Sequence, residues 1–327
     1  MIHSRPILSA NLQLTSVSFG CSAIGNLYQE ITDSSANKVL ERAWEHGIRY
    51  FDTAPHYGRG LAEVRLGRFL KSKARFSFVV STKVGRVLRP GSARDEADGF
   101  INPLPYERHY DYSAAGFEES LAGSRERLGI DKIDLVYIHD IGERTHGADN
   151  GRHLRDLMDT GLPYLAKLKS EGKICGFGLG VNENEICVDI LREHSLDVIL
   201  LAGRWTLLDR SAEDRLVTLC QERGTSLVLG GVFNSGILAT GPVEGAHFDY
   251  KPASPEILAK VGELAKASEK FDLPLAAASL QFAYSRGGVA SVLVGTANPN
   301  SLSRNIAALK TPIDEKTLSF ISSAMKR

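Results

Sequence analysis

Four residues at the ends of three apolar segments have side chains that suit proton transfer. They are Asp52 and Tyr57 in YFDTAPHYG, Lys83 in FVVSTKVGR and His139 in DLVYIHD. If the three segments form neighbouring parallel strands, an acid, a phenol, an amine and an imidazole meet at one rim of a sheet. Such a group can change the proton affinity of the phenol, which favours carbonyl reduction or alcohol oxidation by hydride transfer.

Tyr57 is the residue on which this chemistry depends. A free phenol has a pKa near 10, so it needs neighbours to exchange a proton readily at neutral pH. The ammonium of Lys83, if it lies within about 4–6 Å, is expected to lower that pKa. Asp52 would be the counter-charge of Lys83. The alternative is that Asp52 and Lys83 form only an interior ion pair and Tyr57 only packs; four such residues at one rim favour the catalytic interpretation.

Other kinds of site have weaker support. His139 could bind a metal, but the chain contains no H-x-H, no H-E-x-x-H and no Cys/His cluster, so we predict no metal site. The remaining candidates, His56 and His109, lie in expected loops and are predicted to be surface residues. No G-x-S-x-G motif is present, which argues against hydrolysis by a catalytic triad.

Short apolar runs that alternate with amphipathic segments must position these residues. Most of the runs are continuous, as in parallel strands that are covered on both faces. The strands are predicted over 17–19, 50–53, 78–82, 135–139, 176–180, 198–202, 226–230 and 291–295. Helices are predicted over 34–46, 62–71, 113–128, 161–171, 184–194, 212–223, 255–286 and 301–309.

This alternation predicts an α/β fold, a (β/α)8 TIM barrel that occupies residues 1–327 as one domain. An open, doubly wound sheet is the alternative, but the segment 20–28 lacks the G-x-G-x-x-G pattern of a dinucleotide crevice. Three long connections, 84–112, 140–160 and 231–254, follow strands and should lie at the C-terminal face of the barrel. The first is rich in aromatic and cationic residues and is predicted to be a lid over a polar, ring-shaped ligand rather than a solvated loop.

Composition and charge restrict the partner and the compartment. The chain has 39 basic and 39 acidic residues, so it lacks the charge pattern of a protein that binds nucleic acid or an anionic membrane. From its first residues we expect no secretory signal, and it contains no apolar run long enough to span a membrane. Its four cysteines form no C-x-x-C pair, which fits a reducing compartment. We therefore expect a cytoplasmic protein with a small-molecule partner; the sequence makes no prediction about oligomeric state.

The motifs together resemble those of the aldo-keto reductases over essentially the whole chain. FDTAPHYG, STK and the strand that ends in His139 are similar to the catalytic tetrad of that family. The resemblance implies a barrel that binds a nicotinamide dinucleotide in extended form without a Rossmann unit. It also implies that Tyr57 is the general acid/base, that Lys83 and Asp52 tune it, and that His139 positions the reacting oxygen.

Four further segments resemble the bacterial aldose 1-dehydrogenase branch: DYSAAGFEESLAGSRERLGIDKIDLVYIHD, GLGVNE, LLAGRWTLLDR and GGVFNSGIL. The resemblance implies oxidation of the C1 hemiacetal of an aldose of the L-fucose, L-galactose or D-arabinose type to a lactone. A sister activity is the oxidation of pyridoxal to 4-pyridoxolactone by a pyridoxal 4-dehydrogenase. The alternatives are a general aldehyde or ketone reductase that uses NADPH, a cofactor-sensing binding subunit without activity, and a metal-assisted hydrolase.

The resemblance also implies positions that hold the cofactor. Trp205 would stack on the nicotinamide and Asn182 would bind its amide, whereas Ala202 replaces a glutamine that holds the carboxamide in many relatives. Small residues at the pyrophosphate would be Ser235 and Gly236, whose backbone N–H groups could approach phosphate.

The last strand and helix are expected to contact the adenosine part of the cofactor, through Gly295, Thr296, Arg304 and Asn305. Relatives that prefer NADP carry a lysine and an arginine that hold the 2′-phosphate. Here those positions are Gly295 and Ser301. The resemblance therefore favours NAD, with NADP as the alternative.

Overall fold

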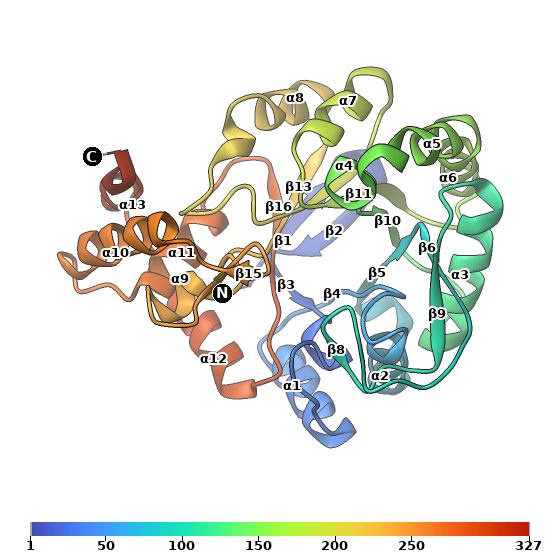
Figure 1. Cartoon of the computed structure of the whole chain (residues 1–327), viewed down its shortest axis with the longest axis horizontal. Coiled ribbons are helices and arrows are strands. Elements are labelled where there is room, and N and C mark those ends of the chain that lie inside the picture. Colours follow the sequence, from blue (N-terminus) through green and yellow to red (C-terminus); the bar gives the residue numbers. More distant parts are fainter. Residues whose placement is uncertain (1, 327) are drawn as a thin grey trace.

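The strands predicted from the apolar runs pair in parallel and close into a barrel (Figure 1). In chain order they are β3 (Val17–Gly20), β4 (Tyr50–Asp52), β5 (Val79–Val84), β10 (Leu135–His139), β11 (Gly176–Val181), β12 (Val198–Ala202), β13 (Ser226–Gly230) and β16 (Val289–Val294). In this computed structural model, which describes residues 2–326, each barrel strand lies beside the next one in the chain, and β16 pairs with β3 to complete the ring. The predicted (β/α)8 barrel is confirmed.

Helices surround the barrel and cover the outward faces of its strands (Figure 1). The helices of residues 2–326, of which α4, α5 and α9 belong to the long connections, are α1 (Asp33–Glu45), α2 (Leu61–Leu70), α3 (Ala114–Leu128), α4 (Glu143–His146), α5 (Asn150–Asp156), α6 (Leu162–Ser170), α7 (Glu185–Glu193), α8 (Leu216–Arg223), α9 (Ile237–Thr240), α10 (Pro255–Glu269), α11 (Leu275–Tyr284), α12 (Pro299–Ala308) and α13 (Glu315–Ser323). Their apolar sides and the outward side chains of the strands form the larger of two hydrophobic clusters.

The prediction of one continuous helix over 255–286 is wrong, because the structure has two helices there, α10 and α11. Pro274 is the N-cap of α11, and the ring of a proline disfavours helical geometry in the residue before it. The chain therefore turns between the two helices. The sequence also did not predict α13, which packs on α10 and α11 at the edge of the molecule (Figure 1).

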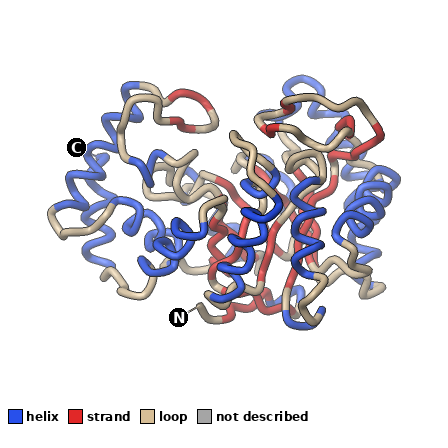
Figure 2. The backbone as a smooth tube through the Cα atoms, turned by 90° about the horizontal axis from the view of Figure 1, so that it is seen from below, coloured by secondary structure: helices blue, strands red, loops and turns tan. Residues whose placement is uncertain are grey.

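An N-terminal hairpin that the sequence did not predict closes one end of the barrel. Its strands are β1 (Ser4–Ile7) and β2 (Leu12–Thr15), which pair in antiparallel register. Ile7 and Leu14 of this hairpin are fully buried, in the same cluster as the interior side chains Tyr50 and Tyr137. Figure 2 shows the N-terminus at this end and the long connections at the opposite end.

Those long connections carry short elements of their own. Residues 84–112 contain the hairpin of β6 (Arg86–Pro90) and β9 (Tyr106–Tyr110), with the smaller pair β7 (Glu96–Ala97) and β8 (Phe100–Ile101) between them. Residues 140–160 contain α4 and α5. Residues 231–254 contain α9 and the pair β14 (His247–Phe248) and β15 (Lys251–Pro252). Because each connection leaves the end of a barrel strand, all three lie at the C-terminal face, as predicted.

Two further features bear on the sequence analysis. Over residues 2–326, none of the helices combines the length and the apolar character that crossing a membrane requires. The cysteines are all free: Cys21, Cys187 and Cys220 are buried, and Cys175 is half-buried.

Candidate active site

The two-residue period of the strands decides which side chains enter the barrel. In β10, Leu135 and Tyr137 belong to the interior cluster, whereas Val136 and Ile138 belong to the outer one. Successive side chains of a strand point to opposite faces, so His139 follows Tyr137 on the interior side, at the C-terminal end. The same period places Asp52 two residues after the interior Tyr50 in β4.

Hydrogen bonds connect these interior side chains into a chain that ends at Lys83. The hydroxyl of Tyr50 lies 2.9 Å from both the Tyr137 hydroxyl and the Ser81 hydroxyl. Ser81 in turn donates to Oδ1 of Asp52 over 2.7 Å. Nζ of Lys83 donates to Oδ2 of Asp52 over 2.6 Å and to the carbonyl of Thr53 over 2.9 Å. Both carboxylate oxygens of Asp52 are thus occupied, and the ammonium of Lys83 is held at the top of the interior.

A tight turn after β4 positions Tyr57. Gly58 has φ of +63°, a conformation that L side chains rarely adopt, and a Cβ atom there would lie 2.4 Å from the carbonyl oxygen of Gly25. The turn therefore requires glycine. It also starts α2, because the carbonyl of Tyr57 accepts a hydrogen bond from the amide of Ala62.

The phenol of Tyr57 lies between two of the other predicted residues. Nζ of Lys83 is 4.7 Å from the centroid of its ring, and the ring of His139 is 6.0 Å away in an edge-to-face arrangement. The structure therefore brings Asp52, Tyr57, Lys83 and His139 together at one mouth of the barrel.

The net shift of the Tyr57 pKa has the opposite sign to the one predicted. Burial raises the pKa of Tyr57 to about 12, although the ammonium of Lys83 acts in the predicted, lowering direction. The prediction was wrong because it considered the charge of Lys83 and could not include the loss of water around the phenol. Burial alone would lower the pKa of Lys83, but the attraction of Asp52 and Tyr57 outweighs it and the net pKa is raised, so Lys83 stays charged.

His139 is fixed from its backbone side. The hydroxyl of Tyr112 donates to the carbonyl of His139 over 2.7 Å. The next residue, Asp140, has φ of +45° and forms an ion pair with Arg86. Burial, followed by the charges of Arg86 and Lys83, holds the pKa of His139 well below its usual value. The imidazole is therefore neutral at neutral pH and carries one N–H that can donate to a ligand.

A cavity of about 450 Å³ opens at this mouth. Tyr57, Lys83 and His139 line it, and Phe100 contributes from the connection that was predicted to be a lid. Its wall is completed by Ser22, Leu27, Tyr28, His56, Asp98, Gly99, Asp140, Gly180, Val181, Asn182, Leu200, Ala202 and Tyr250. This volume suits a small ring-shaped ligand, and the wall combines polar side chains such as His56 and Asp98 with apolar ones such as Phe100 and Leu200.

Sequence reasoning missed several residues of this wall. His56 was predicted to be a surface residue, but its side chain is only 14% exposed and lines the cavity. His109, to which the same prediction applied, is exposed. His56 directly precedes Tyr57 and Asp140 directly follows His139. These positions could have indicated from the sequence that both residues lie near the cavity. Asp98 lies in a long connection, and no sequence signal marked it.

The residues expected near the nicotinamide differ in their placement. Asn182 lines the cavity, and its Nδ2 donates to the carbonyl of Ala202 over 3.2 Å. Trp205 is 5% exposed and packs in the outer hydrophobic cluster, where its indole N–H donates to Glu213 over 2.9 Å. Trp205 is not among the residues that line the cavity. If Trp205 stacks on the nicotinamide, as the resemblance implies, it must do so outside the wall of this cavity.

The expected pyrophosphate turn is built from left-handed residues. Asn234, Ser235 and Gly236 have φ of +44°, +57° and +96° in succession. Oγ of Ser235 accepts a hydrogen bond from the amide of Tyr250, so the turn is tied to the residue that contributes to the cavity wall. The amide of Gly236 donates to the carbonyl of Phe233 over 3.0 Å, so of the two residues expected at the pyrophosphate it is the amide of Ser235 that could approach an anion.

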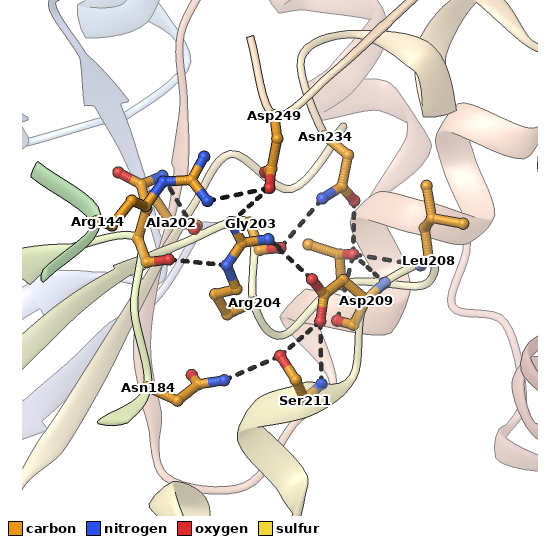
Figure 3. A network of polar contacts seen from close by, with 12 residues as sticks. Arg144, Asn184, Ala202, Gly203, Arg204, Leu208, Asp209, Ser211, Asn234 and Asp249 are labelled. Atoms are coloured by element: carbon orange, nitrogen blue, oxygen red, sulfur yellow. Dashed lines mark hydrogen bonds and ion pairs between the residues drawn. The ribbon is translucent and has the colours of Figure 1, made fainter. Parts of the chain in front are cut away.

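A polar network at the rim holds this turn and its connection in place (Figure 3). Arg204 is its centre: it donates to the carbonyl of Asn182 over 2.8 Å, and its guanidinium pairs with Asp209 at 2.8 Å and Asp249 at 2.7 Å. Arg144 also pairs with Asp249, at 3.2 Å. The network thereby joins the connections after β10, β11, β12 and β13. Three of these connections contribute Asp140, Asn182 and Tyr250 to the cavity wall.

The residues expected at the adenosine end lie at and after the end of β16. Gly295 is close enough to β3 that a Cβ atom would be 3.1 Å from the carbonyl of Gly20. Oγ1 of Thr296 accepts from the amide of Asn298. In α12, Asn305 is half-buried, and Arg304 is exposed and donates to Oγ of Ser301 over 2.8 Å.

No group of three or more histidine, cysteine, aspartate or glutamate residues within 2–326 is arranged to hold a metal ion.

Comparison with known proteins agrees with the geometry. The family model described as "Aldo/keto reductase family" matches residues 16–326. The chain is 39% identical over 313 residues to D-threo-aldose 1-dehydrogenase of a Pseudomonas species, covering 93% of this chain and 92% of the relative. It is also 39% identical over 323 residues to pyridoxal 4-dehydrogenase of Microbacterium luteolum, with 95% and 94% covered.

The fold is shared with solved structures as well. The holo form of the aldo-keto reductase AKR11C1 from Bacillus halodurans superposes with a TM-score of 0.79 at 25% identity, over 99% of this chain and 96% of that one. Both the catalytic geometry and the match over nearly the whole length lead to one assignment. The chain belongs to the aldo/keto reductase family and is an NAD(P)-dependent oxidoreductase.

Proposed function

We propose that this protein oxidises the C1 hemiacetal of an aldose of the L-fucose, L-galactose or D-arabinose type to a lactone, with NAD as the oxidant. The observation that carries the proposal is the convergence of Tyr57, Lys83 and His139 on one cavity, with the buried Asp52 hydrogen-bonded to Lys83. The 39% identity to a D-threo-aldose 1-dehydrogenase supports the substrate class.

Each residue has a separate task in this reaction. Tyr57 takes the proton of the C1 hydroxyl as the C1–H bond breaks, and the neutral imidazole of His139 donates its N–H to the same oxygen. Lys83, charged through its pair with Asp52, stabilises the negative charge that the phenol carries before it accepts the proton. The bound nicotinamide dinucleotide supplies the hydride acceptor.

The chain's own residues suit a dinucleotide in extended form. Asn182 borders the cavity beside Tyr250, and in the left-handed turn the backbone N–H of Ser235 could donate to a pyrophosphate, whereas that of Gly236 donates to the carbonyl of Phe233. At the adenosine end Gly295 brings no side chain, and the exposed Arg304 is the nearby cation, with its guanidinium on Ser301. One exposed arginine is a weak site for a dianionic 2′-phosphate, which supports NAD over NADP.

A second candidate substrate is the cyclic hemiacetal of pyridoxal, which would give 4-pyridoxolactone. The specific support is a pyridoxal 4-dehydrogenase that is as similar to this chain as the aldose enzyme is, at 39% identity. Its aromatic ring could lie against Phe100 and Tyr28 in the cavity wall.

The test is a matrix of initial rates. NAD and NADP are each combined with L-fucose, L-galactose, D-arabinose and pyridoxal in the oxidising direction, and NADH and NADPH with simple aldehydes in the reducing direction. We expect the highest kcat/KM with NAD and one of the aldoses. A preference for NADPH and simple aldehydes would instead make the protein a general carbonyl reductase, and binding of cofactor without turnover of any substrate would make it a binding subunit.

The pKa of Tyr57 predicts how each direction depends on pH. Because burial raises this pKa to about 12, the phenol is protonated throughout the neutral range, and the fraction of phenolate rises about tenfold per pH unit below 12. Oxidation consumes phenolate, so log kcat/KM for the aldose should rise with pH between about 7 and 10. Reduction consumes the protonated phenol and should be nearly constant over that range.

Rates in both directions across this range check the prediction, provided that hydride transfer limits the rate. An aldose deuterated at C1 verifies this through its isotope effect. An oxidation rate that shows a full isotope effect and does not change with pH would mean that Tyr57 is not the group that takes the proton.

A further inference from the structure

A second histidine stands beside the predicted catalytic group. The ring of His56 lies 5.8 Å from the ring of His139 and 6.4 Å from that of Tyr57, centroid to centroid. All three rings line the same cavity. With hydrogen bonds of about 2.9 Å, one small molecule whose oxygen meets Tyr57 and His139 also comes within reach of His56 through an adjacent oxygen.

The free nitrogen of His56 can be assigned from burial. Nδ1 of His56 is buried without a hydrogen-bond partner, as is Nδ1 of His139. The carboxylate of Asp98, 4.0 Å from Nδ1 of His56, is beyond hydrogen-bond distance, and Nε2 of His139 lies 3.5 Å from Oδ2 of Asp140. A buried N–H without an acceptor is costlier than a buried lone pair, so we place the proton of each ring on Nε2. Burial and the nearby charges of Arg86, Arg108, Arg59 and Lys83 also keep the pKa of His56 well below its usual value, so the ring is neutral. His56 therefore offers a single N–H donor to the cavity.

A carboxylate lies on the Nδ1 side of the same ring. The carboxylate of Asp98 lines the cavity, with its Oδ2 4.0 Å from Nδ1 of His56. Arg59 and Arg108 hold Asp98 through contacts of 3.2 and 3.0 Å. Asp98 also has φ of +56°, a strained conformation for a residue other than glycine. Two ion pairs thus hold a charged acceptor at the wall of the cavity.

We propose that His56 and Asp98 together recognise the hydroxyl group on the carbon next to the reacting carbon, so that this site selects polyhydroxylated substrates over simple aldehydes. A hydroxyl both donates and accepts, and here His56 supplies the donor and Asp98 the acceptor. The proposal rests on the proposed aldose oxidation, whose reacting C1 carries a hydroxylated neighbour.

A purely structural role of His56 makes a different prediction. The ring of His56 packs edge-to-face on Phe100 at 5.4 Å, and loss of that packing would disturb the cavity for every substrate alike. The two roles therefore separate when one variant is measured on two substrates that differ only in the adjacent hydroxyl.

The experiment compares kcat/KM for the best aldose and for its 2-deoxy form, with the cofactor at saturation. His56→Phe keeps an aromatic ring and removes the N–H; we expect a loss of about 10- to 100-fold on the aldose and less than about twofold on the 2-deoxy sugar. His56→Gln keeps a donor and should retain part of the discrimination. His109→Phe, a change at an exposed histidine, is the matched control and should leave both values unchanged.

Each outcome has a defined meaning. An equal loss on both sugars overturns the proposal and leaves the aldose oxidation in place. If the unmodified protein turns over no aldose, the proposed function fails and this inference fails with it. Should His56→Phe not fold, Asp98→Ala, which removes the acceptor, decides on the same pair of sugars, because discrimination that is unchanged in that variant also overturns the proposal.

Discussion

Replacement of Tyr57 by phenylalanine is expected to lower kcat by about 10²- to 10⁴-fold, the usual contribution of a positioned acid or base. The variant keeps the ring that packs against His139 and Phe100, and it removes only the hydroxyl that would exchange the proton. Affinity for the dinucleotide should stay nearly the same, because the hydroxyl acts on the proton and not on the cofactor. Stopped-flow rates and a fluorescence titration with NADH measure the two quantities.

The matched control is Tyr164→Phe, which removes a hydroxyl from α6, away from the cavity. It should leave kcat and cofactor affinity unchanged. A Tyr57→Phe variant with normal kcat would exclude the phenol as the acid or base. A variant that lost cofactor affinity as strongly as rate would show that Tyr57 binds rather than reacts.

The sequence predicted those parts of the fold that depend on local pattern. Continuous apolar runs separated by amphipathic segments are enough to specify parallel strands that are buried on both faces. The period of two residues along β10 then fixes His139 on the interior side, because Leu135 and Tyr137 fill that side. Three of the four predicted catalytic residues follow from this geometry alone, and Tyr57 follows from the turn after β4.

Features that depend on distant parts of the chain could not be predicted in the same way. The N-terminal hairpin is short and reveals its role only when Ile7 and Leu14 are seen against the barrel interior. Asp98 lines the cavity and pairs with Arg59, which lies outside its own connection, and with Arg108. The sign of the Tyr57 shift depends on how much water the folded barrel excludes, which no spacing of residues gives.

The residues expected to contact the cofactor show the same difference between local pattern and distant packing. The small residues Ser235 and Gly236, which we expect at the pyrophosphate, are recognisable from sequence, and the structure gives them left-handed conformations. Trp205 shows the reverse case, since an aromatic residue at the expected position packs into the outer hydrophobic cluster and donates to Glu213. Residue type and order are therefore better guides to backbone geometry than to the direction of a large side chain.

Replacement of Lys83 by methionine is expected to affect both rate and stability. Methionine has a similar length but carries no charge, so Asp52 would remain buried, 1% exposed, without its partner. Breaking a buried ion pair from one side typically destabilises a protein by about 3–5 kcal/mol, because the other charge is left uncompensated. The phenolate of Tyr57 would also lose the ammonium 4.7 Å from its ring, and we expect kcat to fall by about 100-fold or more.

The double variant Asp52→Asn with Lys83→Met separates the two effects. It replaces both charged groups, and the asparagine can still accept the hydrogen bond of Ser81 that Asp52 accepts over 2.7 Å. Thermal unfolding should therefore show most of the lost stability recovered, since no unpaired charge is left in the interior. The rate should not recover, because the ammonium beside Tyr57 is still missing. Recovery of both quantities would mean that Lys83 only neutralises Asp52 and has no part in stabilising the phenolate.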